Sequence, residues 1–382
     1  MKASKRLFLL LSSLCLLLLT GCWDETHPQD VVYVTALGID YDGKAFRIFT
    51  QVMDFSSVAK MGEGGKPNQE VPAWIGTAQG ESVQQALNNL ELSTQQVTSL
   101  EHLMTVICTD KALPRLDSIL DAINRIRAVR YTTWVYATRI PIEKLLTVKG
   151  FFNLSPLSTL LYQPEESYRQ SSFIPPREMM RFVSRYREPA GSAYLPSITL
   201  TRSHWRKQDK KETVYTLDGA YFLQHGKPAG YFSRNELRGF RWLTPEFKSS
   251  PLHLKKENHR LAEMMITGMK AQYKVEVSGG KPRYSLYLKA TGRVDEIDPG
   301  VSEQDVVEEV RSQIVSQIRD TYRIGAERGV DVLNLEEKLY RSNNKLWKQV
   351  TSSGPYSPKA EELGEIRVDV HILHYGRFKL VP

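Results

Sequence analysis

The first 21 residues constrain this chain more than any other stretch, because they decide on which side of a membrane the rest of it works. Lys2, Lys5 and Arg6 form a basic start, and an apolar run over residues 7–19 follows, interrupted only by two serines. This order is typical of a secretory signal peptide. The run is 13 residues long, whereas a membrane-spanning helix needs about 20. We therefore expect export, with removal of residues 1–21, rather than a permanent transmembrane segment.

The residues after the apolar run predict a lipid anchor. Leu19-Thr20-Gly21-Cys22 resembles the bacterial lipobox, in which a small residue precedes an obligatory cysteine. The resemblance implies that Cys22 becomes the first residue of the mature chain, as an N-palmitoyl and S-diacylglycerol cysteine. An ordinary signal peptide that happens to be cut near a cysteine is the alternative. Several acyl chains on one residue hold a folded domain at a bilayer, where a single chain binds only marginally.

Length and composition indicate at least two domains. Removal of the signal leaves 361 of the 382 residues, and domains usually take about 100–200 residues. Six prolines fall between residues 153 and 196, and residues 202–212 are almost wholly polar, as is typical of linkers and boundaries. We place the division near residues 197–212. This gives an N-terminal domain over 22–200, which a further boundary could split, and a C-terminal domain over 201–382.

The net charge of the chain excludes few classes of function. The signal takes three basic residues with it and leaves 48 Lys and Arg against 43 Asp and Glu. Basic residues gather at 125–130, 181–187 and 202–211. They could face anionic headgroups, or they could lie on solvated faces of helices and loops. The export signal disfavours nucleic-acid binding.

Of the three cysteines, only Cys108 is left to the folded domain. Cys15 leaves with the signal and Cys22 carries the lipid, so no internal disulfide is expected and the fold must depend on its core. Cys108 ends the run Leu103-Met104-Thr105-Val106-Ile107-Cys108. In such a strand-like run a cysteine is usually a small buried hydrophobe, not a nucleophile.

Hydrophobic periodicity in the first half predicts alternating strands and helices. Residues 31–41 and 45–55 form a hairpin around Asp42-Gly43. Capping signals start helices after Ser82 and Asp110, and Arg177 opens a short helix through Tyr186. Further strands are predicted at 72–79, 103–108 and 134–140. This alternation favours a mixed sheet with helices packed on it.

The second half predicts antiparallel hairpins and long helices. The hairpins cover residues 214–232 and 273–297, and a final strand covers 366–374. A short helix is predicted at 233–242, the longest at 302–327, and another at 332–347 with Asn334 as its cap. The stripe of the longest helix is expected to pack on a sheet, although its spacing also allows a coiled-coil partner; its members are Val307, Val310, Ile314, Ile318 and Tyr322. The fold class is α+β, with two or three mixed α/β domains, antiparallel hairpins and packed helices after a cleaved lipoprotein signal peptide.

No catalytic motif occurs in the sequence. It contains no HExxH, paired-cysteine or Gly-x-Ser-x-Gly pattern. The eight histidines are scattered, and His371 and His374 would point to opposite faces of a strand. We expect no catalytic residue, no metal ligand and no cofactor.

Several short segments, in order, resemble one family. Cys22-Trp23-Asp24 and Ala36-Leu37-Gly38-Ile39-Asp40 resemble the start of Ger(x)C lipoproteins, the C subunits of nutrient germinant receptors in endospore-forming bacteria. The residues at 217–222 with those at 237–242 are similar to the opening of that family's C-terminal domain. Residues 331–341 with Leu346-Trp347 resemble its closing helix, and residues 366–370 its last strand. The likeness covers nearly the whole mature chain and departs from the family pattern at residues 25–28.

The resemblance implies a non-catalytic receptor subunit. Its partners would be an integral-membrane A subunit and a multi-spanning B subunit, and it would be lipid-anchored to the outer face of the cell membrane or spore inner membrane. Such receptors sense nutrients and trigger germination. The alternative from another class is a lipid-anchored solute-binding protein of a transporter. Two similar α/β lobes would favour that alternative, and the two halves of this sequence differ in pattern.

Overall fold

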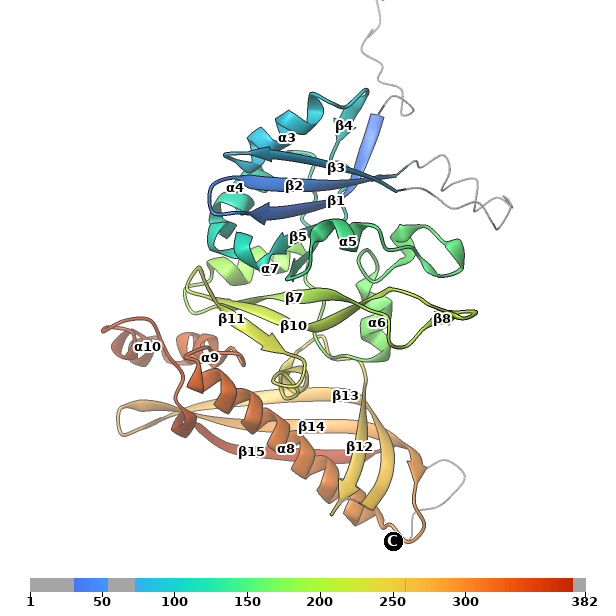
Figure 1. The fold of residues 1–382 in the computed structure, drawn as a ribbon. Helices are drawn as coiled ribbons and strands as arrows, with labels where there is room; N and C mark the ends of the chain where they lie inside the picture. Colours follow the sequence, from blue (N-terminus) through green and yellow to red (C-terminus); the bar gives the residue numbers. More distant parts are fainter. Residues whose placement is uncertain (1–30, 54–72, 258, 374–382) are drawn as a thin grey trace, which may run out of the picture.

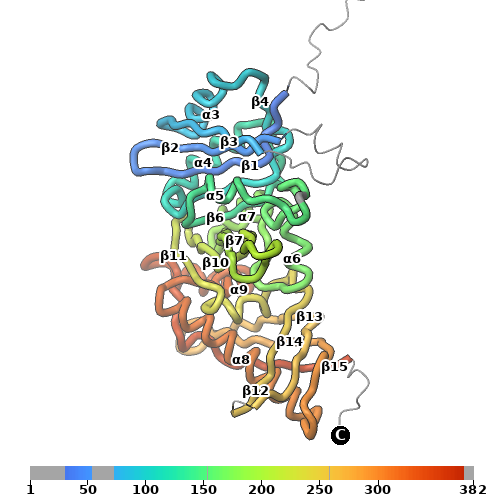
Figure 2. The backbone as a smooth tube through the Cα atoms, turned by 45° about the vertical axis from the view of Figure 1, so that its right-hand side comes forward, coloured from blue at the N-terminus to red at the C-terminus, as the bar shows by residue number. Residues whose placement is uncertain are grey.

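Two β-sheets, one above the other, organise the chain (Figure 1). The computed structural model describes residues 31–53, 73–257 and 259–373. Strands between residues 31 and 233 form the larger sheet, apart from a two-stranded ribbon at residues 206–211, and strands from residue 250 onward form the smaller one. Figure 2, a view turned by 45°, shows the same stacking, so the molecule is elongated along the line that joins the sheets. Helices and sheets in these separate layers confirm the expected α+β class.

The first predicted hairpin is confirmed. Strands β1 (Val31–Tyr41) and β2 (Phe46–Met53) pair antiparallel. The Asp42 carboxylate accepts hydrogen bonds from the backbone N–H groups of Lys44 and Ala45, both at 2.9 Å, and these bonds lower the pKa of Asp42. Gly43 takes a φ of 98°, a left-handed conformation that glycine adopts without steric cost.

The larger sheet has the order β11-β10-β7-β6-β5-β1-β2-β3, with β4 beside β1. Strand β5 is buried along its whole length, because helices cover both faces of the sheet. It contains Cys108, which is 3% exposed, as expected of a small buried hydrophobe. The other strands of this sheet are β3 (Ala73–Gly80), β4 (Val97–Ser99), β5 (Thr105–Thr109), β6 (Trp134–Thr138), β7 (Ser192–Thr201), β10 (Val214–Gln224) and β11 (Lys227–Ser233).

Helices α3, α4 and α7 share a core with one face of this sheet, and α5 shares a core with the other. Within β1, Leu37 and Ile39 contribute to the first core and Ala36 to the second. Asp110 does not cap α4 directly but begins a 3₁₀ turn that leads into it. The helices in this half are α3 (Val83–Glu91), η2 (Asp110–Arg115), α4 (Leu116–Arg125), α5 (Ile142–Leu146), η3 (Phe151–Asn153), η4 (Pro156–Ser158), α6 (Pro164–Gln170) and α7 (Met179–Arg187).

The sheet continues across the position where the sequence places a boundary. Strands β7 and β10 flank residues 202–213 and pair antiparallel over ten residue pairs. The polar segment between them forms a short ribbon of β8 (Arg206–Lys207) and β9 (Lys210–Lys211). The division into domains 22–200 and 201–382 therefore remains a prediction, and strands from both sides of it share one sheet.

The smaller sheet has the order β12-β13-β14-β15 and confirms the predicted hairpin around Gly279 and Gly280. Both glycines take positive φ angles, of 57° and 75°. Strand β13 begins well before the predicted start at Tyr273, because Ala262, Met264 and Ile266 alternate into the core. The strands are β12 (Ser250–Lys256), β13 (His259–Ser278), β14 (Lys281–Ile297) and β15 (Leu363–Ile372).

Helix α8 (Glu303–Glu327) lies across the smaller sheet (Figure 1). The Ser302 hydroxyl accepts from the Asp305 N–H at 3.1 Å, and the Asp305 carboxylate accepts from the Ser302 N–H at 3.2 Å, which makes a complete capping box. The stripe buried against the sheet begins at Val306, since Val307 is only half-buried. The stripe is thus used inside this chain and not by a coiled-coil partner. In the ranges given above, no helix has both the length and the apolar composition that crossing a bilayer needs.

The predicted helix at 233–242 is wrong. The segment forms a turn followed by η5 (Phe240–Leu243). Thr321 of α8 explains the difference, because its hydroxyl accepts from the Gly239 N–H at 2.9 Å and donates to the Glu236 carbonyl at 2.8 Å. These backbone groups would otherwise make helical hydrogen bonds. A contact remote in sequence therefore decides the local structure.

Replacing Gly239 with alanine is expected to lower the free energy of unfolding by about 1–3 kcal/mol. A Cβ atom there would lie 2.3 Å from the Gln317 carbonyl oxygen and 2.5 Å from the Ile318 Cα, both in the backbone of α8. Urea unfolding followed by circular dichroism measures the loss. Gly268→Ala is the control, because its Cβ would meet nothing closer than 3.6 Å. Equal stability of the two variants would contradict the close approach.

The helix predicted over 332–347 is two helices. They are α9 (Leu335–Ser342) and α10 (Asn344–Val350), and the chain breaks at Asn343, whose side chain accepts from the Leu346 N–H at 3.0 Å. Asn334 precedes α9 with a φ of 55°, but its side chain does not cap the helix. The Asp331 carboxylate does, accepting from the Glu336 N–H at 2.7 Å.

Candidate functional site

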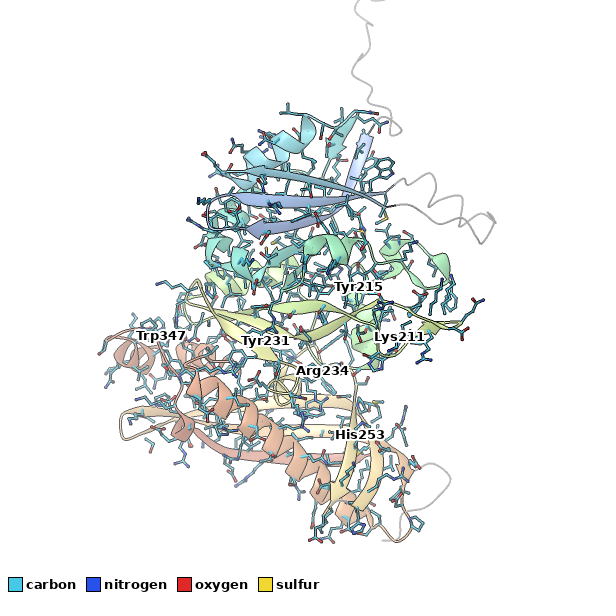
Figure 3. The ribbon with its side chains drawn as sticks, viewed as in Figure 1. Lys211, Tyr215, Tyr231, Arg234, His253 and Trp347 are labelled. Carbon is cyan, nitrogen blue, oxygen red and sulfur yellow. The ribbon has the colours of Figure 1, made fainter. Side chains whose placement is uncertain are left out.

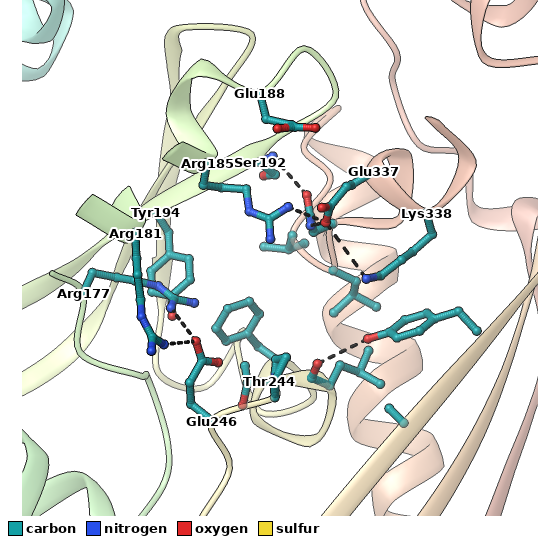
Figure 4. A pocket seen from close by; sticks show the side chains of 18 of the residues that line it. Arg177, Arg181, Arg185, Glu188, Ser192, Tyr194, Thr244, Glu246, Glu337 and Lys338 are labelled. Atoms are coloured by element: carbon teal, nitrogen blue, oxygen red, sulfur yellow. Dashed lines mark hydrogen bonds and ion pairs between the residues drawn. The ribbon is translucent and has the colours of Figure 1, made fainter. Parts of the chain in front are cut away.

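Cys22, the site residue that the sequence predicts, lies outside the described residues, and its lipidation remains a prediction. The candidate site in the described part of the chain is a cleft of about 690 Å³ between α7 and the elements around the smaller sheet (Figure 4). Helix α7 belongs to the first half of the chain, whereas η5, β13 and α9 belong to the second. The cleft therefore lies where the two sheets with their helices meet.

One wall of the cleft contains a carboxylate, Glu246, that two arginines share. Glu246 Oε1 accepts from Arg177 at 2.8 Å and from Arg181 at 3.1 Å, across more than 60 residues of sequence. Burial raises the pKa of Glu246, but the Arg177 charge and hydrogen bond outweigh burial, so the pKa is lowered overall. The Arg177 guanidinium also lies over the Tyr194 ring, 4.4 Å from its centroid. These contacts hold Glu246 ionised.

The opposite wall also contains a carboxylate that two arginines hold. Glu337 has a side chain only 5% exposed, and it pairs with Arg185 of α7 and with Arg341 Nε at 2.8 Å. Burial raises the pKa of Glu337, and the Arg185 hydrogen bond and charge lower it by more. Asn334 contributes twice, donating to Glu337 and accepting from the Ser192 N–H at 3.1 Å. Figure 4 shows Glu337 with Arg185 and Ser192 on one side, and Glu246 with Arg177 and Arg181 on the other.

The chemistry of the cleft is that of binding and positioning. Its two central carboxylates are kept ionised by arginines, whereas a general acid or base requires a pKa near the working pH. Two buried polar atoms that line it, Glu246 Oε2 and Ser192 Oγ, have no hydrogen-bond partner. In the described ranges no three His, Cys, Asp or Glu side chains gather as a metal site would need. The arginine pairs connect α7 to the second half of the chain and so fix its orientation.

A second cluster of carboxyl groups lies at the start of α9. Asp331 is 1% exposed, and its Oδ1 atom has no partner. Burial, together with the nearby Glu336 and Glu362, raises the pKa of Asp331 to about 6, although backbone hydrogen bonds act to lower it. Glu336 is also buried and accepts from Trp347 Nε1 at 2.9 Å and lies 3.1 Å from His225 Nε2.

Asp331→Asn is expected to make the protein more stable than wild type at pH 7, by up to about 3 kcal/mol. In the unfolded chain this carboxyl loses its proton near pH 4, but in the folded protein it keeps it up to about pH 6. The wild type therefore loses stability as the pH rises from 4 to 6, and asparagine, always neutral, does not.

Urea unfolding of both proteins at pH 4 and pH 7 measures the effect. The difference should be small at pH 4 and full at pH 7. Asp209→Asn, at an exposed position on the β8–β9 ribbon, is the control for a general charge effect. A variant less stable than wild type at pH 7 would contradict the buried, costly charge.

Most of the other residues discussed in the sequence analysis do not line the cleft. Burial raises the pKa of Cys108 to about 12, which suits a structural thiol and not a nucleophile. His253 pairs with Glu263 on neighbouring strands, far from the cleft, and His374 lies outside the described residues. Of the basic clusters, residues 181–187 supply Arg181 and Arg185 to the cleft. Their carboxylate partners could not be found from the sequence, because they come from distant segments and form no linear motif.

Comparison with known proteins covers both halves of the chain. The description "Spore germination protein N-terminal domain" matches residues 24–200, and "Spore germination B3/ GerAC like, C-terminal" matches residues 218–376. Spore germination protein KC of Bacillus subtilis (strain 168) is 20% identical over 98% of this chain and 95% of its own length. Spore germination protein GerQC of Bacillus cereus is 24% identical over 76% of this chain and 75% of its own length.

A solved structure shares the fold. The crystal structure of the GerBC protein aligns with a TM-score of 0.55 and 15% sequence identity, over 88% of this chain and 96% of that one. At that identity the likeness concerns the fold alone.

Proposed function

Because this chain belongs to the Ger(x)C family of spore germination proteins, we propose that it is the lipid-anchored, non-catalytic C subunit of a nutrient germinant receptor. Its anchor is the diacylated Cys22 at the outer face of the cell membrane or spore inner membrane. Its partners are the integral-membrane A and B subunits of the same receptor. Its role is to make nutrient-triggered germination possible.

The observation that carries this proposal is the order of three features along the chain. A signal peptide that ends in Leu19-Thr20-Gly21-Cys22 comes first, and the two germination-protein matches follow over residues 24–200 and 218–376. A tether confines the folded body to the bilayer that also holds its partners. This raises their effective concentration and lowers the affinity that each contact must supply.

The geometry of the cleft supports a non-catalytic role. Arginines hold Glu246 and Glu337 ionised and connect the two halves of the chain. A solute-binding protein is not favoured, because its two lobes should be alike. Here a nine-stranded sheet covered on both faces stands against a four-stranded sheet crossed by one 25-residue helix.

Gene deletion in the spore former that carries this chain tests the proposal. Loss of refractility would be timed with a panel of amino acids and sugars, with paralogous receptor genes also removed. We expect the response to at least one nutrient to be lost, and to return with the wild-type gene but not with Cys22→Ala. Unchanged responses to every nutrient would contradict the proposed role.

A further inference from the structure

Two loops of the larger sheet meet through exposed aromatic rings. The 3₁₀ turn η3 contributes Phe151, and the chain just before β8 contributes Trp205. Their ring centroids lie 5.0 Å apart in an edge-to-face arrangement. The two side chains are nevertheless 45% and 54% exposed. The contact joins segments about fifty residues apart and leaves both rings open to solvent.

Phe152 is held in an unfavourable conformation without being buried. Its φ and ψ are 58° and 28°, in the left-handed region that a bulky residue rarely adopts. Such a conformation is strained for a residue with a side chain, and core packing does not offset the strain, since the side chain is 90% exposed. Leu154 follows at 49% exposure. We call Phe151, Phe152, Leu154 and Trp205 the aromatic patch.

Basic residues flank Trp205 of the aromatic patch in the sequence. Residues 202–211 are all exposed and contain five Lys and Arg against one Asp. Among them, Arg202 donates to the Lys211 carbonyl at 3.3 Å, which fixes it across the base of the ribbon. The cleft differs, because its arginines meet buried carboxylates. At the ribbon the basic residues are exposed at the surface.

The β8–β9 ribbon lies at a flank of the larger sheet, and the described chain starts at the end of the molecule beyond that sheet. Figure 1 shows β8 at the right flank of the larger sheet and the start of β1 at the top of the view, and Figure 3 shows Lys211 at the same flank as β8. Nine residue steps separate Cys22 from Val31, and a chain of that length reaches at most about 32 Å. A tether of this length keeps the folded body near the bilayer and lets the flank with the ribbon turn toward it.

We propose that the aromatic patch and the β8–β9 ribbon dock on the anionic headgroup layer of the membrane that holds the lipid anchor. Aromatic side chains favour the interface between headgroups and acyl chains. Lysine and arginine are attracted to anionic lipid within a Debye length of the surface. The site rests on the lipid anchor of the proposed function, and docking fixes the orientation of the tethered body toward its partners. The protruding turn and ribbon, unlike a groove, suit a planar surface.

A single fluorescent probe tests the docking. Cys22 is acylated in the lipidated protein and Cys108 is buried, so an introduced cysteine takes a thiol-reactive nitrobenzoxadiazole label selectively. Phe152→Cys places the label in the aromatic patch. Val277→Cys, 57% exposed at the end of β13, is the matched control. Both lipidated chains would be reconstituted in vesicles of phosphatidylcholine with or without phosphatidylglycerol and a headgroup-region spin-label quencher.

We expect quenching at position 152 that is at least about threefold stronger with phosphatidylglycerol present, and no quenching at 277 in either vesicle. Replacing Lys207, Lys210 and Lys211 with serine should lower the ratio of docked to free protein at least about tenfold. Three exposed lysines elsewhere, Lys255, Lys345 and Lys348, are the charge-matched control set. Two of these flank Trp347, which Figure 3 places away from Lys211. Equal effects of the two triple variants would overturn the proposal.

The outcomes separate the proposal from the anchor on which it rests. Protein that fails to float with the vesicles would show that the anchor is absent. Protein that floats while the probe at 152 stays unquenched would overturn the docking alone. A probe that is shielded in native spore membranes but not in pure lipid vesicles would assign the aromatic patch to a protein partner and would also overturn it.

Discussion

Cys22→Ala is expected to release the whole chain from the membrane. In the proposed anchor, the Cys22 thiol forms the thioether that carries diacylglycerol, and cleavage before Cys22 depends on that modification. Metabolic labelling with radioactive palmitate should give a labelled band for the wild type and none for the variant. Loss of several acyl chains removes far more binding free energy than surface charges can replace, since each buried CH₂ contributes about 0.8 kcal/mol.

The matched control is the other cysteine of the mature chain. Cys108 is buried in β5, and Cys108→Ala should keep its full lipid label. Fractionation of cell membranes in the same experiment should show the Cys108 variant in the membrane pellet and the Cys22 variant in the soluble fraction or retained as precursor. Label that persists on the Cys22 variant would contradict the assignment.

Trp242→Ala is expected to lower the free energy of unfolding by about 3–5 kcal/mol, the usual cost of truncating a large buried aromatic side chain. Trp242 is fully buried in the core between α8 and the smaller sheet. Its indole N–H donates to Gln317 Oε1 at 2.9 Å, and the Arg241 guanidinium lies over its ring, 4.4 Å away. The alanine variant would leave a cavity and an amide oxygen with one donor fewer.

Chemical denaturation of the purified chain measures this loss, with the midpoint moving to lower urea at an unchanged slope. Trp74→Ala is the control, because that indole is 73% exposed and exposed substitutions usually change stability by less than about 0.5 kcal/mol. A Trp242 variant as stable as the Trp74 variant would show that η5 does not belong to the core as described.

Local sequence signals predicted the elements whose determinants are local. The hairpins at Asp42-Gly43 and Gly279-Gly280 follow from turn chemistry that only those residues supply. Helix α8 follows from its apolar stripe. The α+β class and the family resemblance followed from the order of such segments, and both are confirmed.

The elements that were predicted wrongly or missed depend on contacts between residues that lie far apart in the sequence. Thr321 takes the hydrogen bonds that would have made residues 233–242 helical. The first half of β13 was missed because Lys270 and neighbouring exposed positions interrupt its apolar pattern, whereas β12 and β14 complete it by pairing on both sides. The order of the strands in each sheet likewise depends on which strands pair, and hydrophobic periodicity does not identify these pairs.

The residues of the cleft could not be predicted from the sequence for the same reason. Arg177 appeared only as the start of a predicted helix and Arg181 only as a member of a basic stretch, and Glu246 carried no signal at all. The role of the two arginines depends on their contact with Glu246, which lies 65 to 69 residues away in the sequence. Cys22, in contrast, was predicted because recognition of a lipobox needs only contiguous residues.

Purification of the protein from spore membranes tests the central claim most directly. Mild detergent would extract the complex, affinity purification would isolate it through a C-terminal tag, and mass spectrometry would identify the co-eluting proteins and the mass of the N-terminal peptide. The proposed function predicts a diacylated, N-palmitoylated Cys22 and two integral-membrane germination subunits in the same fraction. An unmodified chain recovered alone in the aqueous phase would contradict it.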